Sequence, residues 1–487
     1  MLLTKSDYLL FMQCPKSFWL HKNNPSLLSP GDYQSKVNKQ IEAVFFARDL
    51  FPTGSAVKYS NDPSQMIAET QRLLALGEKT IYQATFEYDG VYVICDILRH
   101  TEHGWHLYTV KSSTRVKDRH LDDLSFQWFV VNENLPLSNS LLIYINNEYV
   151  RRGVLDLKQL FTLYDLTSEI IKRRDAVPIR ISRMKELINE NGVKQDIGPY
   201  CKKYGKDDLE CRAKDHCWSH IPYYSVFDIA RLGKKAFELY NQGIVTLSDI
   251  PANYKLTDPQ SFQVKAYKEN LKVVDTRRIQ TFLSTISYPL YFLDFETYLQ
   301  MVPLYDGDKP YKQIPFQYSI HSLKSKGAVL DHSEFLAIEG SDPRREIAER
   351  LVTKIPKGAC TIAYNISFEK MVLKNLSDHF PDLAEHLLDI HDNLVDLMLP
   401  FQNKWFYLNE MRGSYSLKAV LTALFPNDVS LNYSHLLIKD GSMAMDTFEN
   451  LHTRTPEERN LLREALLAYC KLDTYAMVKI WEHLMKQ

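Results

Sequence analysis

The stretch Tyr291-Phe-Leu-Asp-Phe-Glu-Thr297 decides the interpretation of the C-terminal half of this chain. Its apolar residues predict a buried β-strand, and side-chain alternation along a strand places Asp294 and Glu296 on one face. Far along the chain, Tyr469-Cys-Lys-Leu-Asp473 predicts a helix whose tyrosine and aspartate lie one turn apart. Phosphodiester cleavage with two metal ions needs several carboxylate oxygens at one point. These two segments therefore predict a nuclease.

A third segment, Tyr364-Asn-Ile-Ser-Phe-Glu369, predicts the start of a helix after a strand and adds one more carboxylate. The predicted ligands of Mg²⁺ or Mn²⁺ are Asp294, Glu296, Glu369 and Asp473. Tyr469 completes the catalytic set by orienting the attacking water. Asp396 follows another helix and is a candidate supporting residue. The alternative for these acids is a solvated or ion-paired role.

Length and charge place the chain among folded proteins without a charge bias. Its 487 residues are enough for two or three domains. Lys plus Arg number 59 and Asp plus Glu 60, so affinity for nucleic acid must arise from local patches. The chain has no long apolar run, and Asp7 lies where a signal peptide would be apolar. A cytoplasmic protein without a membrane span is expected.

The order of strand, turn and helix signals along the chain predicts an α/β protein of three parts. Residues 1–222 combine helices with strands at 82–98, 105–111 and 141–145, the first run broken by the turn Asp89-Gly90. Residues 223–288 are a helical linker, in which 240–251 resembles a helix-hairpin-helix with a Ser-Asp N-cap. Residues 289–487 return to α/β, with strands at 291–295, 316–321 and 360–364 and helices at 367–376, 416–424 and 456–484.

The seven cysteines favour metal ligation over disulfides, since the chain has no export features. Three of them lie close together in the sequence, and Cys14 in Cys14-Pro-Lys-Ser-Phe-Trp-Leu20 is the candidate fourth ligand. The predicted cluster is Cys14, Cys201, Cys211 and Cys217. Four thiolates can hold a [4Fe–4S] cluster, which the resemblance to RecB-like nucleases given below implies. Zinc, with His216 or His220 as a ligand, is the alternative.

The C-terminal motifs resemble the DnaQ-like 3′–5′ exonucleases, which have an RNase H fold and four carboxylates, the DEDD set. This resemblance implies two metal ions bound by the carboxylates named above. Glu369 stands where that family has an aspartate. The longer side chain keeps a metal ligand but shifts its geometry.

The cysteine arrangement resembles the iron–sulfur staple of RecB-like nucleases, which implies a PD-(D/E)XK core between the cysteines. The residues that fit this core are Asp96 and Lys111 on neighbouring strands and Gln127 on the following helix. Thr109 occupies the position expected to hold a glutamate, and a hydroxyl carries no negative charge for Mg²⁺. Glu42, on an upstream helix, is a candidate compensating acid. We expect a degenerate site that binds nucleic acid.

Basic residues follow this core and support a nucleic-acid-binding role. They are expected to contact phosphates without reading sequence. The candidates are Arg115, Lys117, Arg119, Lys172, Arg173 and Arg174, with Arg180, Arg183 and Lys185 further on. A solvated charged surface is the alternative.

Taken together, the motifs resemble bacterial domain-of-unknown-function family 2779, whose members join a RecB-like iron–sulfur half to an RNase H-like half. The resemblance implies that Ile314–His321 is a strand beside the site and that Gly413–Lys418 caps a helix near the substrate groove. The expected function is a metal-dependent 3′–5′ exonuclease, with DNA favoured over RNA. The alternatives are a non-catalytic nucleic-acid-binding scaffold, or two active nucleases in one chain with Glu42 or Glu87 replacing the missing ligand.

Overall fold

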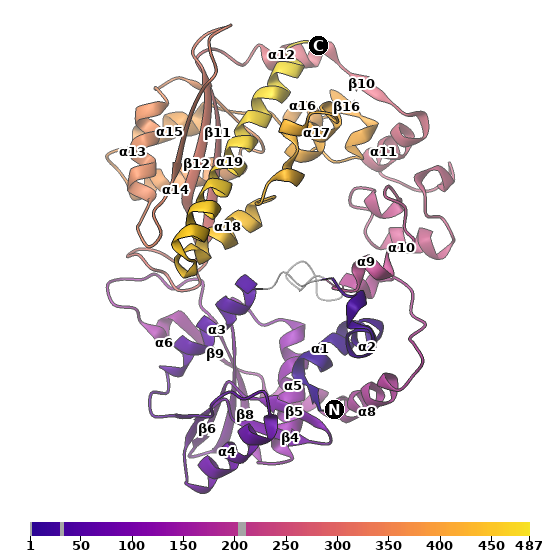
Figure 1. Ribbon diagram of the computed structural model, residues 1–487, viewed down its shortest axis with the longest axis vertical. Helices are drawn as coiled ribbons and strands as arrows, with labels where there is room; N and C mark the ends of the chain where they lie inside the picture. The colour runs from indigo at the N-terminus through magenta and orange to yellow at the C-terminus, as the bar shows by residue number, and fades with distance from the viewer. Residues whose placement is uncertain (1, 30–33, 203–210) are drawn as a thin grey trace. The chain divides into compact units, whose positions relative to one another are not determined.

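The computed structural model describes residues 2–29, 34–202 and 211–487, and it divides the chain into two compact units. Unit 1 consists of Met1–Ile221 and Gln300–Tyr311, and unit 2 consists of Pro222–Leu299 and Lys312–Gln487. The chain therefore passes between the units three times. Both units combine helices with sheets, so the predicted mixed α/β class is confirmed (Figure 1).

Unit 1 is built on a six-stranded mixed sheet of order β2-β3-β6-β7-β8-β9 and a three-stranded sheet of order β1-β5-β4. The strands are β1 (Leu3–Thr4), β2 (Ser55–Ala56), β3 (Thr80–Tyr82), β4 (Thr85–Tyr88), β5 (Val91–Ile94), β6 (Ile97–Thr101), β7 (Gly104–Lys111), β8 (Leu137–Ile145) and β9 (Phe161–Asp165). The helices are α1 (Lys5–Gln13), α2 (Pro15–Asn23), α3 (Gln34–Arg48), α4 (Pro63–Ala75), α5 (Asp118–Asn132), α6 (Leu157–Leu160), α7 (Thr167–Arg173), α8 (Ala176–Ile188) and α9 (Lys214–Cys217).

Local sequence explains how these strands and helices bring the unit 1 residues together. Asp89 and Gly90 both have positive φ, as the tight turn between β4 and β5 requires. The β6–β7 hairpin is antiparallel, whereas β7 and β8 are parallel and are joined by α5. Helix α5 packs against β4, β5 and β8 and is buried over most of its length. Its buried face therefore meets the C-terminal end of β7, where Lys111 lies.

Unit 2 begins with short helices around an apolar core that includes Val226, Leu239 and Leu247. These helices are η3 (Val226–Asp228), α10 (Lys234–Asn241), η4 (Leu247–Asp249), α11 (Asp258–Glu269) and α12 (Thr276–Leu283). The expected Ser-Asp N-cap is wrong. Ser248 and Asp249 lie inside the 3-10 helix η4, and the next α-helix starts at Asp258 behind the capping box of Thr257.

The rest of unit 2 is organised around a five-stranded sheet of order β13-β12-β11-β14-β15. Strand β11 pairs antiparallel with β12 and parallel with β14, and β15 is parallel to β14. The strands are β11 (Leu290–Leu299), β12 (Gln313–Leu323), β13 (Asp331–Leu336), β14 (Cys360–Ala363) and β15 (Leu394–Asp396). A second, two-stranded sheet joins β10 (Lys272–Val274) to β16 (Phe406–Leu408). The predicted strand at 314–321, beside the one carrying Asp294, is confirmed.

Helices cover both faces of the five-stranded sheet (Figure 1). The long helix α19 (Pro456–Leu484) crosses one face and contacts β11 and β12, whereas α13 and α15 lie on the other side. The further helices are α13 (Arg344–Lys354), α14 (Ser367–His379), α15 (Ala384–Asp392), α16 (Leu399–Gln402), α17 (Leu417–Leu424) and α18 (Gly441–Asn450), with the 3-10 turns η5 (Asn409–Met411), η6 (Val429–Leu431), η7 (Tyr433–His435) and η8 (Leu451–Thr453). The predicted helix at 456–484 is confirmed with the same bounds.

Buried polar contacts hold α19 in register on the sheet. Gln317 donates its side-chain amide to the carbonyl of Leu466 at 2.8 Å. One turn beyond Cys470, the hydroxyl of Thr474 lies 2.8 Å from both Ser319 Oγ and His321 Nδ1. Because these contacts flank Asp473, they fix its position over β11. Within the described residues, no helix is both long and apolar enough to cross a membrane.

Candidate metal centre

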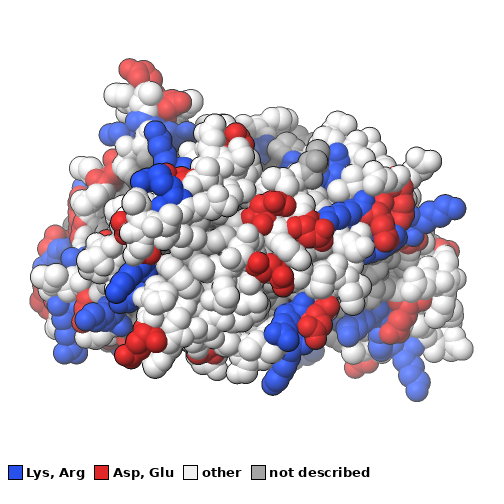
Figure 2. Space-filling model, turned by 90° about the horizontal axis from the view of Figure 1, so that it is seen from below, with Lys and Arg blue, Asp and Glu red and all other residues white. Residues whose placement is uncertain are grey.

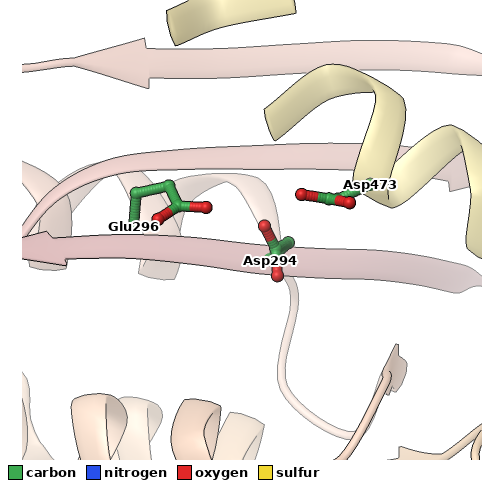
Figure 3. A group of neighbouring side chains, drawn as sticks. All are labelled: Asp294, Glu296 and Asp473. Carbon is green, nitrogen blue, oxygen red and sulfur yellow. The ribbon is translucent and has the colours of Figure 1, made fainter. Parts of the chain in front are cut away.

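Three carboxylates of unit 2 meet at one point above the sheet. Oxygen atoms of Asp294, Glu296 and Asp473 all lie within 4.8 Å of one another. Figure 3 shows the side chains of Asp294 and Glu296 on β11 and that of Asp473 extending from α19 toward them. The strand spacing and the helix position predicted from sequence therefore bring these residues together. The β11–β12 register shifts immediately after Glu296, which marks a β-bulge beside the site.

Burial and mutual repulsion dominate the electrostatics of this cluster. Burial, followed by the charges of neighbouring carboxylates, raises the pKa of Asp294 well above its usual range. The same causes raise the pKa of Glu296 to about 8, and burial raises that of Asp473 to about 6. Carboxylates that share a buried site resist ionising together unless a cation neutralises them. A bound cation should therefore stabilise the ionised form of this cluster.

Glu369, in the first turn of α14, is not one of the three acids whose oxygens lie within 4.8 Å of one another, but it acts electrostatically on Asp294 and Glu296. Its side chain is buried, burial raises its pKa to about 8, and its charge contributes to the raised pKa of Asp294. Its Oε2 atom is buried and has no hydrogen-bond partner in the structure. An orphaned buried carboxylate oxygen beside three other acids fits the hard oxygen ligands that Mg²⁺ and Mn²⁺ require. The residues present therefore fit a divalent cation.

Asp396 has a different task. Its Oδ1 accepts backbone N–H groups of Asn365 and Met398, each at 2.9 Å. Asn365 has positive φ, so this carboxylate stabilises a strained turn directly before α14. Asp396 thereby supports the loop that delivers Glu369.

Two tyrosines surround Asp473. The hydroxyl of Tyr433, on η7, donates to Asp473 Oδ1 at 2.5 Å, and Tyr469 also hydrogen-bonds this carboxylate. Burial raises the pKa of both phenols, with Asp473 adding to the effect. Both tyrosines are therefore neutral donors near pH 7. Tyr469 lies where sequence predicted it, whereas Tyr433 was missed because a tyrosine in an irregular loop carries no motif.

Three further neighbours of the carboxylates were not identified as site residues from sequence. Lys418, in the first turn of α17, lowers the pKa of Glu296 and Asp473. At the start of α18, a Cβ on Gly441 would lie 3.4 Å from Glu296 Oε2. The thiol of Cys470 lies 3.5 Å from Asp294 Oδ2. The sequence pointed to Lys418 only through its place in the segment 413–418. The predicted helix-capping role of this segment is confirmed, because Ser416 caps the N-terminus of α17.

The predicted second site in unit 1 is centred on an acid that sequence reasoning missed. Asp123 of α5 is buried and pairs with Lys111 through Oδ2 and with Lys5 through Oδ1, the latter at 3.7 Å. Gln127 donates to the same carboxylate at 2.7 Å. Burial alone would raise the pKa of Asp123, but the two ammonium groups hold it well below its usual range. The signal was the spacing, since Asp123 lies four residues before the predicted Gln127 on one helical face.

The other residues predicted for this site lie on different parts of unit 1. Asp96 accepts the backbone N–H of Val110 at 2.8 Å and acts electrostatically on Lys5 and Lys111. Thr109 is fully buried on β7, and its hydroxyl has no partner. Glu42 lies on an exposed part of α3. Glu87 accepts the N–H of Gly90 at 2.9 Å and so closes the β4–β5 turn.

Several of the basic side chains predicted to contact nucleic acid form ion pairs with acidic residues of unit 1. Arg173 lies 3.4 Å from Asp118 and from Asp122, and Arg174 lies 3.3 Å from Asp175. Lys172 and Arg115 are exposed, and Lys117 and Arg119 are half-buried. Figure 2 shows a face of the molecule that carries side chains of both charges, separated by a wide uncharged area.

The four predicted cluster cysteines lie in one region of unit 1. The thiols of Cys201 and Cys211 act electrostatically on Cys14, whose pKa burial raises to about 11, and on Cys217. Ser17 contacts Cys14 through its N–H at 3.4 Å and Cys211 through its hydroxyl at 3.8 Å. Within the described part of the chain, no three of the thiols lie within 4.8 Å of one another. Cys95, Cys360 and Cys470 are buried, as expected of core residues.

Comparison with known proteins gives one match. Residues 291–416 match the family model described as Domain of unknown function (DUF2779). The matched segment contains Asp294, Glu296 and Glu369 and ends before Lys418 and α19. Searches of curated proteins and of solved structures return no match.

Proposed function

We propose that this protein is a metal-dependent nuclease whose catalytic centre lies in unit 2. The reaction that fits best is 3′–5′ exonucleolytic hydrolysis of DNA, in keeping with the resemblance to DnaQ-like enzymes. The observation that carries the proposal is the convergence of Asp294, Glu296 and Asp473 within 4.8 Å, with the orphaned Glu369 beside them. The sheet order, three antiparallel strands followed by two parallel ones, supports an RNase H-like fold.

Each residue has a defined task in such a reaction. Asp294, Glu296, Glu369 and Asp473 would hold two Mg²⁺ or Mn²⁺ ions, which supply Lewis acidity and a lowered pKa for bound water. Tyr469 is a neutral donor next to Asp473 and can orient the attacking water through its hydroxyl. Tyr433 fixes the Asp473 carboxylate from the other side. The fixed carboxylates keep their oxygens convergent before substrate arrives.

For unit 1 we propose a degenerate RecB-like nuclease fold that binds nucleic acid. Asp123 is already neutralised by Lys5 and Lys111, and Thr109 adds no charge, so the site offers little to a divalent cation. The four cysteines would hold a [4Fe–4S] cluster. The resemblance to the iron–sulfur staple of RecB-like nucleases supports this proposal, and a zinc site is the alternative.

The direct test is incubation of the purified protein with 5′-labelled single-stranded and duplex DNA and RNA, each with Mg²⁺ or Mn²⁺. We expect laddered loss from the 3′ end that disappears in Asp294→Ala. Asp331→Ala is the matched control, because Asp331 is an exposed acid of the same sheet that pairs with Lys354 at 2.7 Å. Full activity of Asp294→Ala would refute the assignment.

Two alternatives have distinct outcomes. A non-catalytic scaffold is favoured by the ion-paired site of unit 1, and it predicts binding without cleavage under any metal. Two active sites would leave residual cleavage in Asp294→Ala that Lys111→Ala then removes. Comparing these single variants with the double variant separates the three functions.

A further inference from the structure

The ammonium of Lys418 lies at the edge of the carboxylate cluster. Its Nζ is 4.7 Å from the ring centroid of Tyr433 and 5.2 Å from that of Tyr469. It also donates a hydrogen bond to the carbonyl oxygen of Lys439. Both tyrosines hydrogen-bond Asp473, so this cation rests on the two rings that frame a predicted metal ligand. The side chain is half-buried and remains open to solvent on part of its surface.

The fold determines where Lys418 points. It follows Ser416, whose hydroxyl caps the N-terminus of α17 by accepting the N–H of Ala419. The turn before this cap is tightly packed, because a Cβ on Gly413 would lie 2.3 Å from the side chain of Gln263. Gly413 also has positive φ, which favours glycine there. The lysine therefore extends from a fixed helix start.

This position opposes the binding of divalent cations. Lys418 acts electrostatically on Glu296 and Asp473, and a positive charge beside metal ligands repels a second positive charge. A lysine there reduces metal affinity, and once metal ions neutralise the carboxylates, an incoming anion can take their place as its charge partner. The expected anion is the phosphodiester that the proposed reaction cleaves.

Charge balance identifies that partner. Four carboxylates would be neutralised by two divalent cations, and a phosphodiester then brings one negative charge that the ammonium can balance. We propose that Lys418 is a further catalytic residue, which contacts a non-bridging oxygen of the scissile phosphodiester. This inference rests on the proposed nuclease function of unit 2. Such a contact strengthens as negative charge develops on the phosphate oxygens in the transition state.

The test compares Lys418→Gln and Lys418→Arg with the wild-type full-length protein in two binding measurements. Calorimetric titration of the metal-free protein with Mn²⁺ measures the carboxylate site without nucleic acid. Fluorescence anisotropy in Ca²⁺, with a single-stranded oligonucleotide carrying 3′ phosphorothioate linkages, measures the phosphate contact over a range of salt concentrations. DNA and RNA versions of this probe are used in parallel.

We expect Lys418→Gln to bind Mn²⁺ as tightly as the wild type or up to about tenfold more tightly, because a repelling charge is removed. It should bind the oligonucleotide about tenfold more weakly, with a salt slope smaller by about 0.7. Lys418→Arg should restore oligonucleotide binding, because it keeps the positive charge. This pattern, in which oligonucleotide affinity falls while Mn²⁺ affinity does not, is not produced by a merely structural lysine.

Two results would overturn the inference. Parallel loss of Mn²⁺ and oligonucleotide affinity in Lys418→Gln would indicate a structural role. Unchanged oligonucleotide affinity and salt slope in Lys418→Gln would show that the ammonium does not contact phosphate. The nuclease assignment would remain intact in that case, provided that the wild-type protein binds Mn²⁺ and cleaves. Failure of the wild type to bind Mn²⁺ would instead refute the nuclease assignment itself.

Discussion

The phenol of Tyr433 donates a 2.5 Å hydrogen bond to Oδ1 of Asp473, although the two residues come from separate elements, η7 and α19. A charge-assisted contact of this length fixes the orientation of the carboxylate. Asp473 is also one of the three acids whose oxygens converge above β11. The loop that carries Tyr433 is thus coupled directly to the candidate metal centre.

Replacing Tyr433 with phenylalanine should weaken metal binding by about 10- to 100-fold, the usual effect of removing a partner that orients a ligand. The ring remains, so the packing against Tyr469 is kept. Titration with Mn²⁺ measures the effect. Tyr469→Phe is the informative comparison, because loss of a water-orienting group should lower kcat and leave Mn²⁺ affinity closer to that of the wild type. Identical behaviour of the two variants would argue against separate roles.

Metal-free protein should lose stability as the pH rises from 6.5 to 8.5. The folded pKa of Glu296 and Glu369 is about 8, above the value in an unfolded chain, so folding retains protons that the unfolded chain has released. Stability is therefore lost as pH rises through the folded pKa, by on the order of 2 kcal/mol for each of the two groups. Below pH 6.5, His321 and His332 act in the opposite direction, since burial lowers their pKa to about 3 and about 4.

Scanning calorimetry of the chelator-treated protein measures this dependence. Saturating Mn²⁺ should flatten the profile and raise Tm most at high pH, because the neutralised carboxylates no longer repel one another. Glu369→Gln should flatten it partly without metal. Stability that is constant or rises over this pH interval in the metal-free wild type would contradict the assignment.

Asp123→Asn should destabilise unit 1 by about 3 kcal/mol or more. Removing the acid leaves Lys5 and Lys111 half-buried without their shared counter-charge, and breaking a buried ion pair carries a cost of this size. Chemical denaturation followed by tryptophan fluorescence measures the loss, since Trp128 lies on the same helix. Asp118→Asn is the matched control on α5, because its side chain is 82% exposed. Equal effects of the two changes would contradict a central role for Asp123.

The cysteine proposal predicts protein-bound iron and sulfide that depend on Cys14 and Cys201. Cys201→Ser should lose the cluster and its visible absorption, since the thiolate is the cluster ligand. Cys360→Ser is the control, because Cys360 lies on β14 of unit 2. Anaerobic purification followed by iron, sulfide and zinc analysis gives the answer. Stoichiometric zinc without iron would favour the zinc alternative.

Periodicity was enough to predict much of the candidate metal centre. The strand spacing of Asp294 and Glu296 and the helical spacing of Tyr469 and Asp473 are local properties, so each pair could be assigned to one face before any tertiary contact was known. Ordered motifs then linked the pairs to Glu369. What the motifs do not contain is the orientation of loops that close over the site.

The missed residues depend on tertiary packing. Tyr433 reaches Asp473 from an irregular loop, and Lys5 reaches Asp123 from the first turn of α1. Neither has a local pattern that points to its partner. Glu42, a suitable acid on a suitable helix, lies on an exposed part of that helix. Residue type and spacing identify candidates, but only the fold decides which of them meet.

The path of the chain through unit 1 limits how this protein can be divided. Residues 300–311 connect β11 to β12, yet Met301, Val302 and Tyr311 pack into a core of unit 1, and Arg151 bonds to the carbonyls of Pro303 and Leu304 at 2.8 Å. A fragment ending at residue 221 would lack this segment and expose that core. Exchange of either unit by recombination would therefore need three crossover points, after residues 221, 299 and 311.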